Sequence, residues 1–277
     1  MLREDNPYLQ QVTWLLEVLP LVGREPCFAL KGGTAINLFV RDLPRLSVDI
    51  DLAYLPVHKR ETSLAEIGMA LERIATAIET KSRGSNVQRT TAEGHTIKLI
   101  AWRNGVRVKI EVSPVLRGCL RAPAVRGVSP VVEAQFGYVE VQVVHLHDLY
   151  AGKLCAALDR QHPRDLFDVK LLLAHEGIDQ DLLDVFVVYL LSGDRPLAEM
   201  LSPNRQPLAA AYAGEFLGMT LLPVTQQELE QTRETMIGLI RDQLTEPQKQ
   251  FLLRFKQGEP DWALLNLPGV EALPAVQ

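Results

Sequence analysis

Two aspartates, one residue apart, are the first side chains in this sequence whose spacing suggests chemistry. They lie in the stretch "LSVDIDLAYL", residues 46–55, where apolar residues alternate with polar or small ones. This period of two is typical of a β-strand, so Asp49 and Asp51 are predicted to project from one face, with Cα atoms about 7 Å apart. Two carboxylates this close repel each other unless a cation binds between them or one is protonated. The alternative is a solvated polar face on an edge strand.

A pair of glycines upstream indicates a phosphate-binding turn. Gly32 and Gly33 follow a short strand candidate, residues 27–30. Thr34 is predicted to be the N-cap of a helical segment that runs to Val40. Glycines let backbone N–H groups approach a phosphate closely, and the start of a helix favours anions.

A third carboxylate, Glu111, lies in a second predicted strand, "VKIEV". Its alternation places Lys109 and Glu111 on one face and the apolar residues on the other. Asp49, Asp51 and Glu111 would together form an oxygen-ligand site for Mg²⁺, or for Mn²⁺ in its place. Such a site suits metal-assisted in-line phosphoryl or nucleotidyl transfer, in which metal ions bridge the phosphates and an acid accepts the proton of the attacking hydroxyl.

Other polar residues near these acids have two interpretations. Arg45 and Ser47 precede the aspartates, and Ser47 shares their predicted strand face, so both could bind a phosphate or could be ordinary surface residues. The region around the predicted hairpin at Asn104-Gly105 is basic, which suits either an RNA backbone or a solvated face. Its basic residues are Lys98, Arg103, Arg107, Lys109, Arg117, Arg121 and Arg126.

The periodicity along the chain predicts a mixed α/β domain over residues 1–144 and an all-helical domain over residues 145–277. In the first domain, helices are expected at 8–22 and 64–78, and strands at 27–30, 46–55, 86–91, 96–102, 106–114 and 139–144. In the second, helices are expected at 148–158, 164–176, 181–191 and 226–244.

Composition limits the possible functions only broadly. A net charge of −5 argues against a uniformly basic surface that coats nucleic acid, although a local basic groove remains compatible with it. Arg3, Glu4 and Asp5 leave no apolar segment for a signal peptide, and no apolar run is long enough to span a membrane. We expect a cytoplasmic protein with no membrane partner.

The motif "LKGGTAINLFVRDLPRLSVDIDL", followed much later by an acid on a strand, resembles the DNA polymerase β-type nucleotidyltransferase superfamily. More closely, it resembles the AbiEii/AbiGii toxin family of type IV toxin–antitoxin and abortive-infection systems. The downstream stretch "AGKLCAALDRQHPRDLFDVKLLL" is similar to that family's helical lysine followed by an Arg-Asp-x-x-Asp segment, here Lys153 and then Arg164, Asp165 and Asp168. The resemblance covers roughly residues 25–175.

The resemblance implies a polymerase β-like N-terminal domain with a mixed sheet, followed by a helical lobe. It also implies that Asp49 and Asp51 hold metal and that Glu111 is the third acid. The residues implied to bind the nucleotide are Gly32, Gly33, Thr34, Arg45, Ser47, Lys153 and Asp165. The role of Asp168 stays open between orienting Lys153 and touching the nucleotide or acceptor.

Lys153 and Asp168 lie on consecutive predicted helices that His162-Pro163 separates, so an antiparallel return would bring them together. A cationic Lys153 would then stabilise charge on a departing pyrophosphate. The alternative is a structural salt bridge that pins the two helices.

The acids and the glycine turn predict a Mg²⁺-dependent nucleotidyltransferase that uses an NTP, and the resemblance implies that it is a toxin with a cognate antitoxin encoded by a neighbouring gene. By resemblance it would transfer NMP to an RNA acceptor, with the tRNA 3′ end as the candidate, and so block translation. One alternative is a nucleotidyltransferase that modifies a small molecule or a protein hydroxyl, which the acidic net charge mildly favours. Another is a nucleotide-binding regulatory module with degraded catalysis, against which the presence of all three acids argues.

Overall fold

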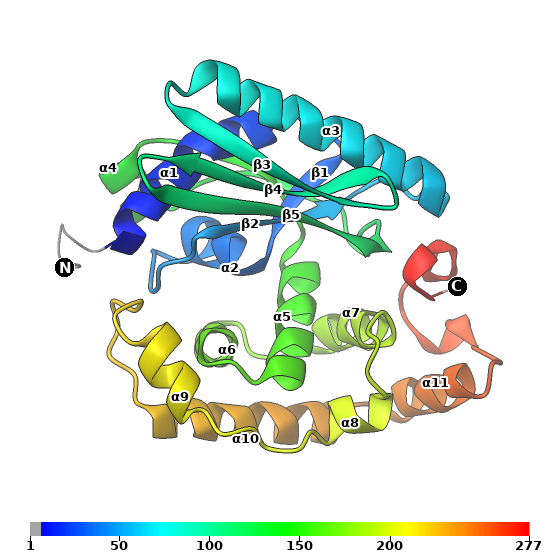
Figure 1. Ribbon diagram of the computed structural model, residues 1–277. Helices are drawn as coiled ribbons and strands as arrows, with labels where there is room; N and C mark the ends of the chain where they lie inside the picture. Colours follow the sequence, from blue (N-terminus) through cyan, green and yellow to red (C-terminus); the bar gives the residue numbers. More distant parts are fainter. Residues whose placement is uncertain (1–6, 277) are drawn as a thin grey trace. The chain divides into compact units, whose positions relative to one another are not determined.

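The computed structural model describes residues 7–276 (Figure 1). The chain divides into two compact units, one that comprises the described residues up to His145 together with Met219–Leu222, and one that comprises Leu146–Gly218 and Pro223 onward. Arg3, Glu4 and Asp5, on which the signal-peptide argument depended, lie outside the described residues. Within the described range, no helix is both long and apolar enough to cross a membrane.

The first unit contains all the strands of the described chain. Its helices are α1 (Pro7–Val22), α2 (Gly32–Ala35), α3 (Arg60–Lys81) and α4 (Pro130–Phe136), with a π-helical turn at Ile36–Val40 after α2. Its strands are β1 (Phe28–Lys31), β2 (Asp49–Tyr54), β3 (Ser85–Ala92), β4 (His95–Arg103), β5 (Val106–Arg117), β6 (Ala124–Gly127) and β7 (Glu140–Val143). The predicted helices and strands of this region are confirmed except for the start of the strand predicted at 46–55, whereas α4 and β6 were not foreseen. Both are short, and β6 is largely exposed, so neither produces a hydrophobic period.

The seven strands form one mixed sheet in the order β3-β4-β5-β2-β1-β7-β6. β2 lies near the centre, antiparallel to β1 and parallel to β5. The β3-β4-β5 meander is antiparallel throughout, with Asn104-Gly105 at the predicted hairpin turn. The mixed α/β fold predicted from the sequence is therefore confirmed.

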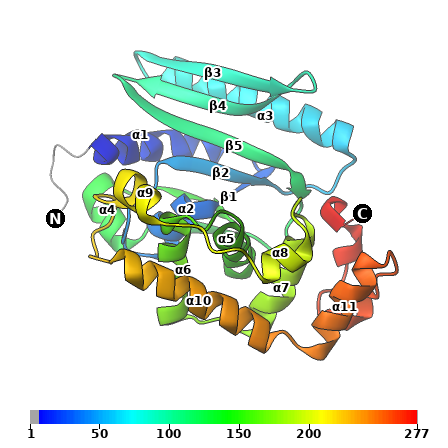
Figure 2. The ribbon, with the colours of Figure 1, turned by 60° about the horizontal axis from the view of Figure 1, so that its bottom comes forward.

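One face of this sheet is apolar and is covered by helices. Ile50, Ile110 and Leu99 are fully buried and lie in one register row across β2, β5 and β4. α3 packs on β3 and β4, α1 packs on β5 and β2, and the two helices also contact each other (Figures 1 and 2). We call the opposite face of β3, β4, β5 and β2 the open face. It carries Asn86, Gln88, Thr90, Lys98, Ile100, Trp102, Arg107, Lys109, Glu111, Asp49 and Asp51.

The strand predicted to begin at Leu46 begins instead at Asp49. The residues before it form an irregular segment that pairs with the returning segment Met219–Leu222. Leu46 donates its backbone N–H to the carbonyl of Met219 at 2.7 Å, and Leu221 donates to the carbonyl of Pro44 at 2.9 Å. This pairing takes residues 44–46 away from the sheet, so alternation in the sequence overestimated the strand at its start.

The second unit is helical. Its helices are α5 (Leu146–Arg160), α6 (Pro163–His175), α7 (Gln180–Leu191), α8 (Leu197–Leu201), α9 (Ala209–Ala211), α10 (Gln226–Gln243) and α11 (Glu246–Lys256). A π-helical turn at Tyr212–Phe216 and 3₁₀ turns at Trp262–Leu264, Val270–Ala272 and Pro274–Val276 complete it. The four predicted helices are confirmed as α5, α6, α7 and α10, whereas α8, α9 and α11 were not foreseen.

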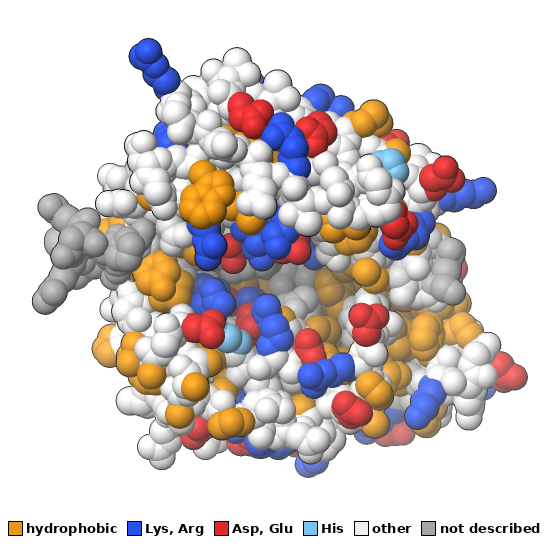
Figure 3. Space-filling view, viewed as in Figure 1, with side chains coloured by type: hydrophobic (Ala, Val, Ile, Leu, Met, Phe, Trp, Pro, Cys, Tyr) orange, Lys and Arg blue, Asp and Glu red, His pale blue; other side chains and the backbone are white. Residues whose placement is uncertain are grey.

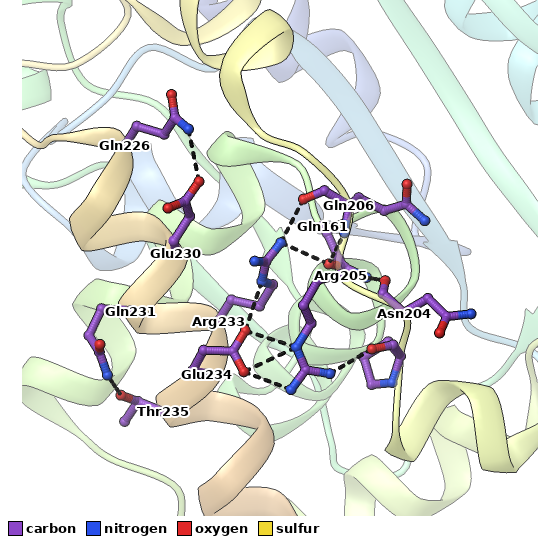
Figure 4. Close-up of polar contacts among 11 residues, drawn as sticks. Gln161, Asn204, Arg205, Gln206, Gln226, Glu230, Gln231, Arg233, Glu234 and Thr235 are labelled. Atoms are coloured by element: carbon purple, nitrogen blue, oxygen red, sulfur yellow. Dashed lines mark hydrogen bonds and ion pairs between the residues drawn. The ribbon is translucent and has the colours of Figure 1, made fainter.

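A polar network fixes the extended segment between α8 and α9 (Figure 4). The buried side chain of Gln161 donates to the carbonyl of Asn204 at 2.7 Å and accepts from the N–H of Gln206 at 3.0 Å. Arg233 of α10 donates to Gln161 and to the carbonyl of Gln206, while Arg205 forms an ion pair with Glu234. Side chains thus bond the backbone of this segment in place of regular secondary structure.

Candidate active site

Strand β2 presents the two aspartates because its other face is buried. Ile50 and Leu52 are 0% and 1% exposed, so they anchor the strand, whereas Asp49 and Asp51 are half-buried on the open face. A one-residue slip of β2 would bury both carboxylates and expose two core residues, which makes this register strongly specified.

The parallel neighbour β5 brings the third acid beside them. Asp51 is in register with Glu111, and Asp49 is in register with Lys109. The row continues to Lys98 of β4 next to Glu111 and to Lys31 of β1 next to Asp51. The three predicted acids therefore share one face, flanked by lysines on both sides.

Lys109 holds Glu111 in its ionised form. Their side chains form a salt bridge with an Nζ to Oε2 distance of 2.8 Å. The hydrogen bond from Lys109 is the main reason that the pKa of Glu111 lies below its usual value. Burial lowers the pKa of Lys109, but the hydrogen bond to Glu111 and the charges of Asp49 and Asp51 outweigh it and raise that pKa overall. Glu111 is consequently a carboxylate at neutral pH, the form that accepts a proton or binds a cation.

The three acids are neighbours, but they do not form a complete metal-binding site. Across the described part of the chain, no group of three Asp, Glu, His or Cys side chains is close enough together to hold a metal ion as it stands. The donor set is nevertheless of the kind that Mg²⁺ takes, because it consists of carboxylate oxygens on two rigid neighbouring strands.

The two glycines permit close approach of the chain to these side chains. Gly32 has φ +75°, and a Cβ there would lie 2.6 Å from Oδ2 of Asp51. A Cβ at Gly33 would lie 2.6 Å from Nη2 of Arg45 and 3.0 Å from Oγ of Ser47. The two 2.6 Å distances are shorter than real Cβ atoms show, so any larger residue in this turn would displace the Asp51 carboxylate or the Arg45 guanidinium.

Thr34 ties the glycine turn to β2, and it is not an N-cap. The helix begins at Gly32 with Lys31 as its N-cap, so the predicted capping role is wrong. The Thr34 hydroxyl donates to the backbone carbonyl of Asp49 and lies 3.0 Å from Oγ of Ser47. Since one hydroxyl proton serves one acceptor, Ser47 is the donor in the second bond. The hydroxyl is used to join two elements instead of capping a helix.

Arg45 and Ser47 are buried, at 3% and 8% exposure, so neither is an ordinary surface residue. Ser47 lies before β2 begins, so the prediction that it shares the strand face of Asp49 is wrong. Arg45 donates to the carbonyl of Leu46 at 3.0 Å, and its guanidinium lies against Gly33. Both side chains support the glycine turn from the side of the irregular segment.

In the second unit, Lys153 meets both aspartates of the Arg-Asp-x-x-Asp segment. Its Nζ lies 2.8 Å from Oδ1 of Asp165 and 3.0 Å from Oδ2 of Asp168, and all three residues are buried. Arg160 binds the other oxygen of Asp165 at 2.8 Å. His162 caps α6 by accepting the N–H of Arg164, which starts the return of the chain from α5. The predicted proximity of Lys153 and Asp168 is confirmed, and the geometry also ties α5 to α6.

Sequence reasoning did not assign a role to Lys31 or Lys109, although both flank the acids in register. Lys109 could have been found from the sequence, because the alternation in "VKIEV" places it on the strand face of Glu111. Lys31 had none, because its position beside Asp51 depends on the pairing of β1 with β2.

Comparisons with known proteins identify the family and the fold of this chain. The sequence profile described as "Nucleotidyl transferase AbiEii toxin, Type IV TA system" matches residues 14–274. No curated protein sequence matches the chain. The fold is similar to the solved structure of MenT4, a nucleotidyltransferase toxin from Mycobacterium tuberculosis, with a TM-score of 0.67 and 17% identity over 89% of this chain and 87% of that one. The family match covers nearly the whole chain and indicates nucleotidyltransferase activity, an NTP substrate and an antitoxin partner. The chain belongs to the AbiEii nucleotidyltransferase toxin family.

Proposed function

We propose that this AbiEii-family chain transfers NMP from an NTP to an RNA acceptor, in a Mg²⁺-dependent reaction whose candidate acceptor is the tRNA 3′ end. The observation that carries the proposal is the placement of Asp49 and Asp51 on one face of β2 with Glu111 in register on β5, beside a glycine turn in which a Cβ would displace Asp51 or Arg45. This is a set of rigid oxygen donors next to backbone that a phosphate can approach.

In the proposed reaction, the oxygen of an acceptor hydroxyl bonds to the α-phosphorus of the NTP. The bond from that phosphorus to the bridging oxygen of the β-phosphate breaks, and pyrophosphate leaves. Asp49 and Asp51 would hold a divalent cation, which supplies charge neutralisation at the phosphates and a lowered pKa for the attacking hydroxyl. Glu111 accepts the hydroxyl proton, a role that its ionised state permits.

The remaining residues would bind and orient the nucleotide. Gly32, Gly33 and Thr34 bring the backbone to the triphosphate, and Arg45 and Ser47 support that turn. By family resemblance, Lys153 binds phosphate, while Asp165 and Asp168 position its ammonium group. Each of these roles is a proposal, and the Gly32→Ala variant below tests the glycine turn.

The test is incubation of purified protein with α-labelled NTPs, Mg²⁺ and total RNA, followed by sequencing of the labelled RNA ends. Asp49→Asn and Asp51→Asn should abolish labelling and leave the melting temperature unchanged or slightly raised, because each removes a charge from a repelling pair and keeps the side-chain volume. Asp242→Asn, at a side chain 75% exposed on α10, is the matched control and should label normally. Near wild-type labelling by either β2 variant, or labelling that survives chelation of divalent cations, would show that Asp49 and Asp51 do not hold a catalytic metal ion.

A further inference from the structure

The open face carries an exposed tryptophan beyond the aspartates. Trp102 on β4 has 37% of its surface accessible. Its neighbour Arg103 turns toward the helix-covered face, where its guanidinium lies 4.0 Å from the ring centroid of Trp14 and pairs with Glu17. Alternation along β4 therefore directs Trp102 to the opposite, open face.

Cationic and amide side chains surround this tryptophan. Arg107 is in register with Trp102, and its guanidinium lies 5.9 Å from the ring centroid, within the range of a cation–π contact. Lys98 lies four residues away on the same strand face, in register with Glu111. Within residues 7–276, neither Lys98 nor Arg107 forms a salt bridge. On the edge strand β3, Asn86 and Gln88 add exposed hydrogen-bonding groups in register with β4. Figure 3 shows basic, acidic and hydrophobic side chains next to one another over β4 and β5.

The tryptophan is within reach of the proposed reaction. Asp49 is in register with Lys109, and Lys109 with Ile100, which is two residues from Trp102 along β4. Two inter-strand spacings and two residues of strand separate the Cα atoms of Asp49 and Trp102 by about 12 Å. A few nucleotides of an extended single strand span that distance.

We propose that the open face from Asp49 outward to Trp102 binds the single-stranded end of the acceptor RNA. Trp102 stacks on an unpaired base, Arg107 neutralises the adjoining phosphate, and Lys98 neutralises a phosphate closer to Glu111. The inference rests on the proposed function and names the surface that holds its acceptor. An exposed aromatic ring on a rigid sheet, with cations and amides around it, is how sheet-based domains bind unpaired RNA. A protein partner fits less well, because a protein interface needs an apolar centre depleted of charge.

The experiment measures binding separately from transfer. Fluorescence anisotropy of a labelled single-stranded RNA oligonucleotide is recorded without NTP, so no reaction occurs, across a series of salt concentrations. Trp102→Leu should weaken binding by about 5- to 150-fold, and Trp102→Phe should retain most of the affinity because it keeps a stacking surface. Lys98→Gln and Arg107→Gln should each reduce the slope of log K against log salt by about 0.7.

Two exposed residues elsewhere in the unit serve as matched controls. Tyr138→Leu removes an exposed aromatic ring next to β6, and Arg24→Gln removes an exposed charge after α1. Both should bind RNA as the wild type does.

The proposal is overturned if the Trp102 and Lys98 variants bind RNA with wild-type affinity and salt slope while their melting temperatures are unchanged. A protein would then be the partner that this face binds. If RNA binding depends on Trp102 but the wild type labels no RNA with any NTP, the surface stands and the proposed function fails.

Discussion

A single methyl group at Gly32 should disable the active site while lowering stability only by the cost of a left-handed alanine, about 1–2 kcal/mol. The Cβ of Gly32→Ala would lie 2.6 Å from Oδ2 of Asp51, whereas ordinary contact begins at 3.4 Å, so the carboxylate must retreat by about 0.8 Å. A displacement near 1 Å of a group that positions the reactants can reduce turnover about 100-fold. We therefore expect the rate of nucleotide transfer by Gly32→Ala to fall roughly 100-fold.

Gly84 provides the control for backbone strain. It has φ +78°, close to the +75° of Gly32, but a Cβ at Gly84 would meet nothing within 4 Å. An alanine in this left-handed region costs about 1–2 kcal/mol at either position. Each kcal/mol lost lowers the melting temperature by about 2–4 °C, so both variants should unfold at a similarly reduced temperature. Only Gly32→Ala should lose activity.

The assay compares single-turnover transfer and thermal unfolding for the wild type and the two alanine variants. Equal activity of Gly32→Ala and Gly84→Ala, at equal melting temperatures, would refute the reasoning. It would mean either that Asp51 moves freely without consequence or that its carboxylate is not part of the reaction.

Two further predictions concern the buried Lys153 and the half-buried Cys27. Lys153→Ala leaves the buried Asp165 and Asp168 without their shared cation and should lower the free energy of unfolding by about 3–5 kcal/mol, measured by urea denaturation. Adding Asp168→Asn should recover part of that loss, and Lys153→Arg should lose less; a Lys153→Ala variant as stable as the wild type would contradict the ion-pair account. Burial, with a smaller contribution from Glu25, raises the pKa of the Cys27 thiol to about 11. Alkylation of Cys27 by iodoacetamide should therefore be slow at pH 8 and accelerate about tenfold per pH unit up to that value, whereas fast alkylation at pH 8 in the folded protein would show an accessible thiolate.

Much of the site could be predicted because it depends on local patterns. Alternation around Asp49 and Asp51 predicted their common face, since burying Ile50 and Leu52 leaves the carboxylates only the other side of β2. The paired glycines likewise indicated a tight approach of backbone to the site. Helical periodicity and the break at His162-Pro163 predicted the return that joins Lys153 to Asp168.

Only the tertiary structure decided which strands pair and in what register. Asp51 and Glu111 are 60 residues apart in sequence, and their pairing depends on how β2 and β5 pack against α1 and α3. The β2–β5 pairing also places Lys109 beside Asp49, and the β1–β2 pairing places Lys31 beside Asp51. Of these positions, the sequence neighbourhood specifies only that Lys109 shares a face with Glu111.

Tertiary contacts also overrode local preferences at the glycine turn. Thr34 is a favoured N-cap residue by type, but its hydroxyl instead satisfies the carbonyl of Asp49. The strand expected from Leu46 starts three residues later because the segment Met219–Leu222 returns to take its hydrogen bonds. The sequence by itself determined the residues that could carry the chemistry and the face on which each strand displays them. Their assembly into one site was decided by long-range backbone pairing, because a backbone N–H or C=O bonds to whichever partner the packing of the whole unit brings near.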